Sequence, residues 1–293
     1  MRRSAGFSLI EMIVVMVAIG IVVAAVVFFL NPVRQAVDVT VRAELTDIAD
    51  NALQRIGRDV RLALPNSVRV DATRQYLEFI PVRTAGRYRA DGGQPSSGAD
   101  CPATPGIGTP DSDQLSFDVS EQCFKSVGTV PDAATIVAGS DELVLSNYGA
   151  GFAGQDAYAA AAPNRALITA SLAQPTRQRL DFAPRTFQRS LHDSPGRRFY
   201  VVAQPVSYVC DTAARTLTRR WGYGFLAAQP TAFGAGSSAE IADNVTACAF
   251  DYVANVAPQL GLLTLRLTLT KNTSGGTPEI VSLVHAVHVR NVP

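Results

Sequence analysis

The most constraining feature of this 293-residue chain is an uncharged apolar run near its N-terminus, from Met12 to Leu30. At 1.5 Å per residue, a helix of this length measures about 28 Å, close to the thickness of the hydrocarbon core of a bilayer. One carboxylate, Glu11, stands directly before the run. Because an ionised acid drawn toward the bilayer centre costs roughly 2.5–3.5 kcal/mol, Glu11 indicates a task that an apolar residue cannot perform, such as pairing with a buried cation.

The residues around the run predict its orientation. Arg2 and Arg3 precede it, and an excess of basic residues before a first span holds that end in the cytoplasm. No convincing small-x-small cleavage site follows Leu30, so the run is not a discarded secretory signal. We therefore expect a single-pass anchor in the inner membrane, with the remaining chain on the periplasmic side.

The segment Gly6-Phe7-Ser8-Leu9-Ile10-Glu11 and the apolar helix after it resemble the N-terminus of type IV pilins and of type II secretion pseudopilins. The resemblance implies that residues 1–6 are a leader. It also implies that prepilin peptidase cuts between Gly6 and Phe7 and N-methylates the new terminus. A residue without a Cβ at the cleavage site fits this step, because it lets the backbone approach an active site closely.

The same resemblance gives Glu11 a role. Cleavage would leave a cationic α-ammonium group on Phe7, and Glu11 of a neighbouring subunit could neutralise it inside a filament. Such a pair would set the register of the subunits, since deleting one partner leaves a buried charge. The alternative is a plain single-pass anchor in which the acid has no special role.

The second part of the N-terminal helix is expected to be amphipathic. Apolar residues recur there every three or four positions, with charged residues between them: Val37, Val41, Leu45, Ile48, Ala52, Ile56, Val60 and Ala63. Pro32 predicts a kink and Pro65 predicts the end of the helix. The expected organisation is a leader at 1–6, a transmembrane and assembly helix at 7–31, an amphipathic helix at 32–64 and a β-rich extracytoplasmic domain at 65–293.

After Pro65 the apolar pattern changes to a period of two, which is typical of strands. The clearest case is the alternation of Leu263, Leu265, Leu267 and Leu269 with polar residues, which indicates a sheet with one buried face. Strands are expected at 74–82, 114–119, 142–148, 199–211, 216–223, 245–253, 262–271 and 279–289. An antiparallel sheet packed on the long helix gives an α+β fold, the roll that the pilin resemblance implies.

Two segments, 84–110 and 227–239, are rich in small residues and proline and are expected to be loops. Four cysteines form an even set in a domain that we expect to face an oxidising compartment, where disulfides persist. We pair Cys101 with Cys123 and Cys210 with Cys248, although three connectivities are possible. Zinc ligation is the weaker alternative, because no two cysteines have C-x-x-C spacing.

One glycine pattern is typical of nucleotide-binding sites. Gly149, Gly151 and Gly154 spell G-x-G-x-x-G after a strand-like segment, as a dinucleotide site requires. Such a site also needs a parallel βαβ unit and an acid about twenty residues on. After Asp156 the next acid is Asp181, so we expect an ordinary loop.

Two patterns could suggest a metal. His285 and His288 are three residues apart on an expected strand, so they point to opposite faces, and His285 shares the face of Leu283 and Val287. A cluster of acids lacks the frame of a calcium loop and is expected to be solvated: Asp111, Asp113, Asp118 and Glu121. We therefore expect no metal, no cofactor and no small-molecule substrate, and no constellation of residues predicts an enzyme.

The balance of charge limits the partners. The formal net charge is +1 and would become −1 after removal of Arg2 and Arg3, so no overall field favours nucleic acid. The expected partners are prepilin peptidase, other pilin subunits, the inner membrane and the pilus assembly platform.

The C-terminal third carries a narrower resemblance, in VSYVCD, TLTRRW, ADNVTACAFDY, LLTLRLTLT and VSLVHAVHVRNVP. These segments are similar to minor pilins of the mannose-sensitive haemagglutinin (MSHA) pilus, which are themselves similar to the J-type minor pseudopilins of type II secretion. The resemblance implies a low-abundance subunit that initiates or caps a fibre. A minor pseudopilin is one alternative. An adhesin that uses loops near 84–113 or 227–239 is another.

Overall fold

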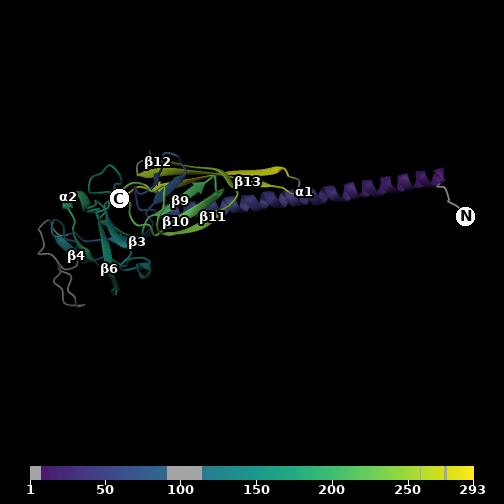
Figure 1. The fold of residues 1–293 in the computed structure, drawn as a ribbon. Helices are drawn as coiled ribbons and strands as arrows, with labels where there is room; N and C mark the ends of the chain where they lie inside the picture. The colour runs from purple at the N-terminus through teal and green to yellow at the C-terminus, as the bar shows by residue number, and fades with distance from the viewer. Residues whose placement is uncertain (1–7, 91–113, 258, 274–275) are drawn as a thin grey trace.

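The computed structural model describes residues 8–90, 114–257, 259–273 and 276–293. Of residues 27–38 and Asn255 it describes the backbone alone. The molecule is elongated (Figure 1). A long helix, α1 (Leu9–Arg61), projects from a β-rich body that covers its C-terminal part, and a second β-rich unit lies beyond the end of the helix. A mostly antiparallel β fold behind an N-terminal apolar helix confirms the α+β class.

Helix α1 runs without a break through Asn31 and Pro32, where a kink was expected. A single proline removes only one backbone donor, and the helical hydrogen bonds on either side of it maintain the helix. The helix ends at Arg61 and not at residue 64, because the backbone of the next residues forms hydrogen bonds with residues 80–82. The Leu64 N–H donates to Ile80 O at 2.8 Å, and the Val82 N–H donates to Leu62 O at 2.8 Å.

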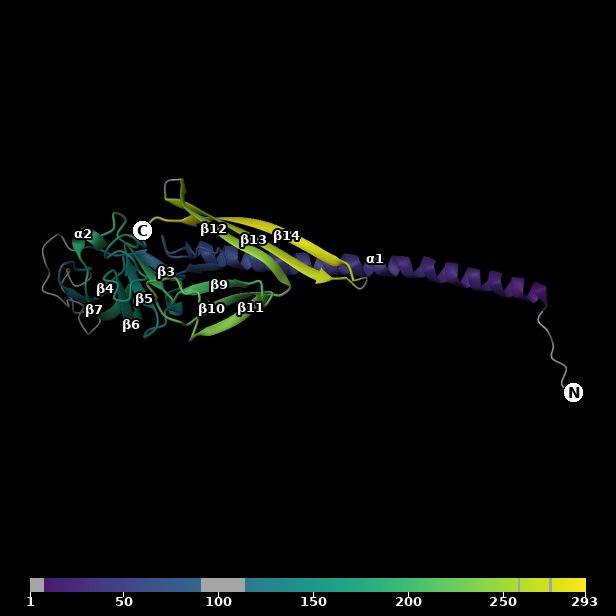
Figure 2. The same ribbon diagram turned by 45° about the horizontal axis from the view of Figure 1, so that its top comes forward.

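The body around the helix, which we call the proximal body, contains two antiparallel sheets (Figure 2). The first has the order β1-β2-β9-β10-β11 and consists of Arg69–Val70, Tyr76–Phe79, Val206–Asp211, Thr216–Trp221 and Ser237–Ala242. The second has the order β12-β13-β14 and consists of Val245–Ala257, Leu260–Asn272 and Pro278–Arg290.

The core of the proximal body is the contact between the apolar stripe of α1 and the inner faces of these sheets. The helix contributes the buried residues Leu45, Ala49, Ala52, Leu53, Ile56 and Val60. Opposite them, Leu263, Leu265, Leu267 and Leu269 of β13 are buried, whereas Arg266 between them is exposed. Since burial of one such side chain contributes about 1.5–3 kcal/mol, this seam holds the sheets on the helix as the sequence pattern predicts.

The second unit, which we call the distal unit, is a six-stranded antiparallel sheet of order β3-β8-β5-β6-β7-β4. Its strands, in chain order, are Val82–Arg87, Ser120–Lys125, Glu142–Leu145, Arg165–Ala173, Gln178–Thr186 and Arg198–Val202. A short 3-10 helix, Ala133–Thr135, and a short helix, α2 (Arg189–His192), accompany the sheet. The distal unit has its own aromatic core, in which the rings of Phe124 and Phe199 lie 5.1 Å apart.

The distal unit is inserted between two paired strands of the proximal body. The chain leaves the body after β2 and returns at β9, which pairs with β2 through Phe79 and Val206. The two crossing segments touch, since the Ala203 N–H donates to Pro81 O at 3.0 Å. A third apolar cluster spans the junction: Leu64, Ile80, Val144, Ala157, Tyr158 and Val202.

Several predicted strand boundaries are wrong. The expected strand at 199–211 is two strands in different sheets, because residues 203–205 carry the chain from the distal unit to the proximal body and Pro205 has no N–H for a ladder. No strand forms at 114–119, where Asp118 has a φ of 63° and its N–H donates to Phe187 O. The expected loops at 84–110 and 227–239 contribute residues to β3 and β11. The hairpin β6–β7 was not predicted.

Candidate functional site

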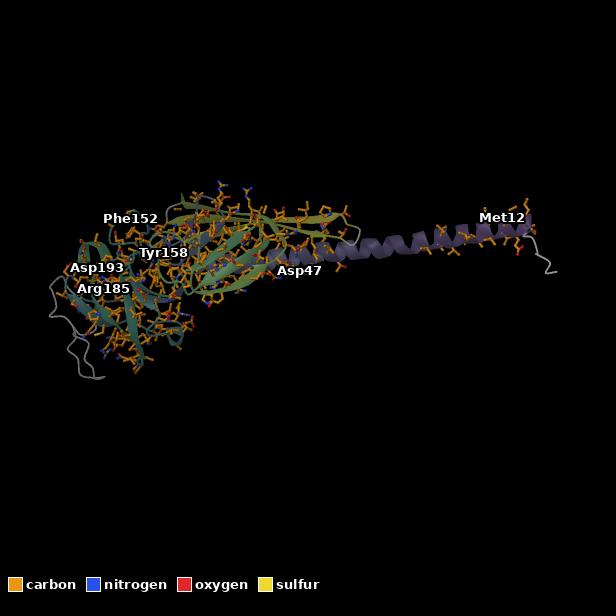
Figure 3. All side chains as sticks on the ribbon, in the orientation of Figure 1. Met12, Asp47, Phe152, Tyr158, Arg185 and Asp193 are labelled. Carbon is orange, nitrogen blue, oxygen red and sulfur yellow. A yellow bond between two sulfur atoms is a disulfide. The ribbon has the colours of Figure 1, made fainter. Side chains whose placement is uncertain are left out.

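The first candidate site is the projecting part of α1 (Figures 1 and 3). Residues Leu9–Val26 have a mean hydropathy of 2.9, and none of them is buried. Large apolar side chains are exposed on every side of this helix, among them Leu9, Ile13, Met16 and Ile21. Such a surface is not stable in water, so lipid or other apolar helices must cover it.

Glu11 lies in the first turn of α1 and is exposed. The helix begins after Ser8, whose carbonyl accepts hydrogen bonds from the Glu11 N–H at 3.0 Å and the Met12 N–H at 3.3 Å. A carboxylate in the first turn is favoured by the unpaired N–H groups at the helix N-terminus. Gly6 and Phe7, the predicted cleavage residues, lie outside the described residues, and pairing of Glu11 with a neighbouring subunit stays a prediction.

Polar contacts fix where the proximal body sits along α1. Asp59 Oδ2 accepts from the Tyr208 hydroxyl at 2.8 Å and forms an ion pair with Arg219 Nε at 3.1 Å. Burial, and then the negative charge of Asp59, raise the pKa of Tyr208, so the phenol stays a donor. Nearer the membrane segment, Lys271 Nζ lies 2.8 Å from Glu44 Oε1. These contacts keep the exposed helix and the body in one relative position.

The predicted bond between Cys210 and Cys248 is present, with Cα atoms 6.4 Å apart. It joins β9 of the first sheet to β12 of the second, and both strands line the core on α1. Cys123 is also disulfide-bonded. Cys101, its predicted partner, lies outside the described residues.

The G-x-G-x-x-G pattern forms a loop, as expected. Gly149, Gly151 and Gly154 have φ values of 84°, 97° and 80°, and turns follow them instead of a helix. A Cβ at Gly149 would lie 2.6 Å from Asn66 O, so glycine is required there by close packing of backbone. The loop lacks the strand-to-helix turn that holds a pyrophosphate.

The two histidines of β14 point to opposite faces, as predicted. His285 is half-buried and packs against Gly57 of α1, whereas His288 is exposed. Among the acids, Glu121 was expected to be solvated, and this prediction is wrong. Its side chain is buried in β4, where Oε1 accepts from the N–H groups of Gln122 and Cys123. Asp118 accepts from the Arg189 N–H at 3.1 Å, and Asp111 and Asp113 lie outside the described residues. Within the described ranges no group of three or more metal-ligand residues occurs.

One buried polar network has no signal in the sequence. Glu78 is fully buried and accepts from Arg69 Nε at 2.6 Å and from the Tyr223 hydroxyl at 2.9 Å. The guanidinium of Arg69 stacks 3.6 Å from the ring of Tyr158 and also donates to two carbonyls of the loop after β10. Burial raises the pKa of Glu78, and the bonds from Arg69 and Tyr223 oppose the rise. Since the groups satisfy one another, the network is structural.

The N-terminal segment was compared with known families. Residues 1–27 match the family model described as the prokaryotic N-terminal methylation motif. The N-terminus carries a prepilin signal. The motif supports a subunit of the type IV pilin or pseudopilin type, processed by prepilin peptidase and assembled with other pilin subunits. Together with the apolar helix it fits a single-pass anchor in the inner membrane.

Comparisons of the whole chain with curated proteins and with solved structures gave no significant match. The prepilin signal covers only the leader and the first part of α1. No comparison therefore assigns a function to the proximal body or to the distal unit.

Proposed function

We propose that this chain is a minor pilin: a low-abundance, non-enzymatic subunit that initiates or caps a type IV pilus. The observation that carries the proposal is the distal unit, an inserted six-stranded sheet with its own core beyond the C-terminal end of α1 (Figure 2). A subunit of the fibre bulk must repeat along a lattice. An extra unit of this size on every subunit would crowd that lattice.

The direction of the distal unit supports a place at the tip. In a fibre built from parallel helices, each subunit would direct the C-terminal end of α1 away from the membrane. The distal unit extends in that direction, because it joins the body next to the end of α1 at residues 62–64 and 80–82. At the tip no subunit lies above it. In the middle of a fibre it would compete for space with the next body.

The N-terminal segment supports the processing steps of the proposal. Prepilin peptidase would remove residues 1–6 and methylate Phe7, and the assembly platform would then draw the apolar helix from the inner membrane into the fibre. The exposed apolar surface of Leu9–Val26 is suited to both surroundings, because lipid chains and neighbouring helices are equally apolar. This role requires neither a cofactor nor a catalytic group.

Within the minor pilins, the segments of the C-terminal third favour an MSHA-type subunit similar to the O-type minor pilin, MshO. A minor pseudopilin of type II secretion shares the same N-terminal motif and is the second candidate. The two differ in the subunits they contact, so co-purification with pilus or with secretion components distinguishes them.

The proposal is tested by two measurements on the full-length chain in a host that carries prepilin peptidase. Intact mass and N-terminal sequencing should show a start at N-methylated Phe7, and Gly6→Ala should retain the leader as a processing control. Immunogold labelling of the filaments should then place the protein at fibre ends. An unprocessed Met1 start would exclude the pilin pathway, and labelling along the whole fibre would exclude a minor, tip-located role.

A further inference from the structure

Six arginines form a continuous surface across the junction of the two units, which we call the basic strip: Arg61, Arg87, Arg89, Arg197, Arg198 and Arg290. Five of them are exposed and Arg198 is half-buried. They come from the end of α1, from the end of β3 and the residues after it, from the start of β8 and the residue before it, and from the end of β14. Segments far apart in the sequence therefore bring like charges together.

The first half of the strip lines a cleft of about 610 Å³ between the units. Arg61, Arg198 and Arg290 line this cleft with Tyr200 and Gln259, and no acid is among its described lining residues. The Tyr200 hydroxyl donates to Val292 O at 3.0 Å, which fixes the ring at the cleft wall. Burial raises the pKa of Tyr200, and the positive charges of Arg198 and Arg290 oppose that rise.

The second half lines a cleft of about 500 Å³ on the distal unit, where Arg87, Arg89 and Arg197 are among the lining residues and none of the lining residues that the structure describes is an acid. The two clefts are neighbours, because Arg87 on β3 lies directly opposite Arg198 on β8. Both side chains are on the outer face, since the adjacent residues Tyr88 and Phe199 are buried. The strip thus runs from one cleft into the other across a pair of adjacent strands.

The charges of the strip are not neutralised within the described part of the molecule. None of the six arginines has a carboxylate within 4.0 Å there, whereas Arg69, Arg83, Arg165 and Arg219 elsewhere in the two units each form an ion pair. Like charges directly opposite on neighbouring strands are destabilising. The pair of Arg87 and Arg198 therefore costs stability in the free protein, and a polyanion would remove that cost.

The position and shape of the strip select among polyanions. Arg61 lies 35 residues beyond Val26 on one continuous helix, about 50 Å from the apolar span, so lipids of the anchoring bilayer cannot reach it. Single-stranded nucleic acid is usually held by several exposed aromatic rings on which the bases stack. Among the described residues that line the two clefts, the aromatic ones are Tyr200, which is half-buried, and Tyr88, which is buried. The two clefts have volumes within the range of small-ligand sites, which suits a chain of sugar rings more than a duplex.

We propose that the basic strip binds a negatively charged polysaccharide, with carboxylate or sulfate groups of successive sugars seated in the two clefts. Arginine suits this role because its planar guanidinium binds such oxyanions through two parallel hydrogen bonds. The site is separate from the N-terminal assembly segment, so its test does not depend on the minor pilin assignment.

The test uses the full-length protein in a non-ionic detergent and three polyanions: polygalacturonate, heparin and duplex DNA. Binding is measured by titration at several salt concentrations. The strip variant carries Arg87→Gln, Arg198→Gln and Arg290→Gln. The control variant carries Arg55→Gln, Arg215→Gln and Arg266→Gln, which removes the same charge from exposed arginines of the proximal body that have no ion pair among the described residues.

The strip variant should bind a polysaccharide at least about tenfold more weakly than the wild type, because it lacks three guanidinium groups that would bind the oxyanions. The control variant should stay within about twofold. Carboxylate and sulfate ligands are distinguished by comparing polygalacturonate with heparin. Equal weakening in both variants, tighter binding of DNA than of either polysaccharide, or no binding at low salt would each overturn the proposal. If the strip variant fails to fold, the pair Arg87→Gln and Arg290→Gln, both at exposed positions, replaces it.

Discussion

At the scale of single residues, Glu11 is the acid whose position the fold itself does not explain. It is exposed at the start of α1, far from either core, and the structure assigns it no partner within the described residues. A carboxylate in that place costs free energy in a membrane, so its benefit must come from another molecule. We expect that partner to be the freed N-terminus of a neighbouring subunit, as the resemblance to pilins implies.

We expect Glu11→Ala to leave cleavage of the leader intact and to reduce incorporation into filaments severalfold or more. The physical reason is that the variant leaves a cationic N-terminus unpaired in an apolar fibre core, and breaking a buried pair from one side costs about 3–5 kcal/mol. The measurement is the ratio of protein in sheared filaments to protein in membranes. Glu11→Gln separates charge from size, and normal incorporation of both variants would contradict charge pairing.

His192 of α2 is fully buried beside Phe187. Its Nδ1 accepts from the Gln188 N–H at 2.9 Å, so the ring is neutral with the hydrogen on Nε2, which donates to Gly154 O at 2.9 Å. Burial lowers the pKa of His192 below 6.5. The bond to Gly154 opposes this, the charge of Arg185 adds to it and that of Asp118 opposes it.

Because the pKa is lower in the folded state than in the unfolded state, the stability due to neutral His192 is present above pH 6.5 and is lost as the pH falls through the folded value. Protonation would place a hydrogen on Nδ1, so that it faces the Gln188 N–H and the hydrogen bond between them is lost. Leaving such a buried donor unsatisfied costs about 1–3 kcal/mol. The melting temperature should therefore drop between pH 7.5 and 5. His192→Gln should reduce that drop, while His288→Gln, at an exposed position, should not.

At the scale of elements, the packing of α1 on β14 depends on a glycine. Gly57 is buried, and a Cβ there would lie 3.0 Å from His285 Nε2 and 3.3 Å from Val287 Cγ2. The helix and the strand therefore approach more closely than larger residues would permit. Since the same helix carries the projecting apolar segment and a buried stripe of the proximal core, this crossing couples the position of that segment to folding of the body.

We expect Gly57→Leu to lower the free energy of unfolding by about 1–3 kcal/mol, because a larger side chain forces the helix from the sheet. Ala43→Leu, at an exposed position of the same helix, should change it by less than about 0.5 kcal/mol. Both are measured by urea unfolding in detergent. Shortening His285 to Ala in the Gly57→Leu background should recover part of the loss, and no recovery would mean that the strain lies elsewhere.

The disulfide joins the two sheets of the proximal body. It closes a loop with a sequence separation of 38 between Cys210 and Cys248. Replacing both cysteines by serine should cost about 2–4 kcal/mol. The change is read from thermal unfolding of the double variant against the wild type, both without reductant. A loss below 1 kcal/mol would indicate that helix packing alone fixes the sheets.

At the scale of the whole molecule, the distal unit is an insertion whose two ends meet. The strands that flank it, β2 and β9, pair antiparallel, and Pro81 and Ala203 are hydrogen-bonded to each other. The two units have separate cores, joined by a small apolar cluster that includes Leu64 and Val202. This arrangement resembles a complete body with an added module.

Replacing residues 83–202 by a short Gly-Ser loop should therefore leave a body that folds cooperatively, with lower stability because the junction cluster becomes exposed. The loop would convert β2 and β9 into a hairpin, which their antiparallel pairing permits. Circular dichroism and urea unfolding test the fold, and recovery from sheared filaments tests assembly. Loss of cooperative unfolding would mean that the distal unit is required for the body to fold.

The sequence by itself determined the N-terminal anchor, the amphipathic helix, the face of β13 that is buried and the α+β class. Each of these follows from a local pattern: an apolar run long enough to span, a helical period, or alternation along one strand. The pairing of Cys210 with Cys248 was one of three possibilities, and only the tertiary structure decided that it is present.

Only the tertiary structure decided that the chain has two units and that six arginines meet at their junction. The crossing at residues 203–205 lies within an apolar stretch that has the pattern of one strand, because nothing local marks a change of sheet. The arginines of the basic strip are separated by up to 229 positions, from Arg61 to Arg290, and no period links them. Strand pairing between distant segments brings them together, and local sequence does not encode which segments pair.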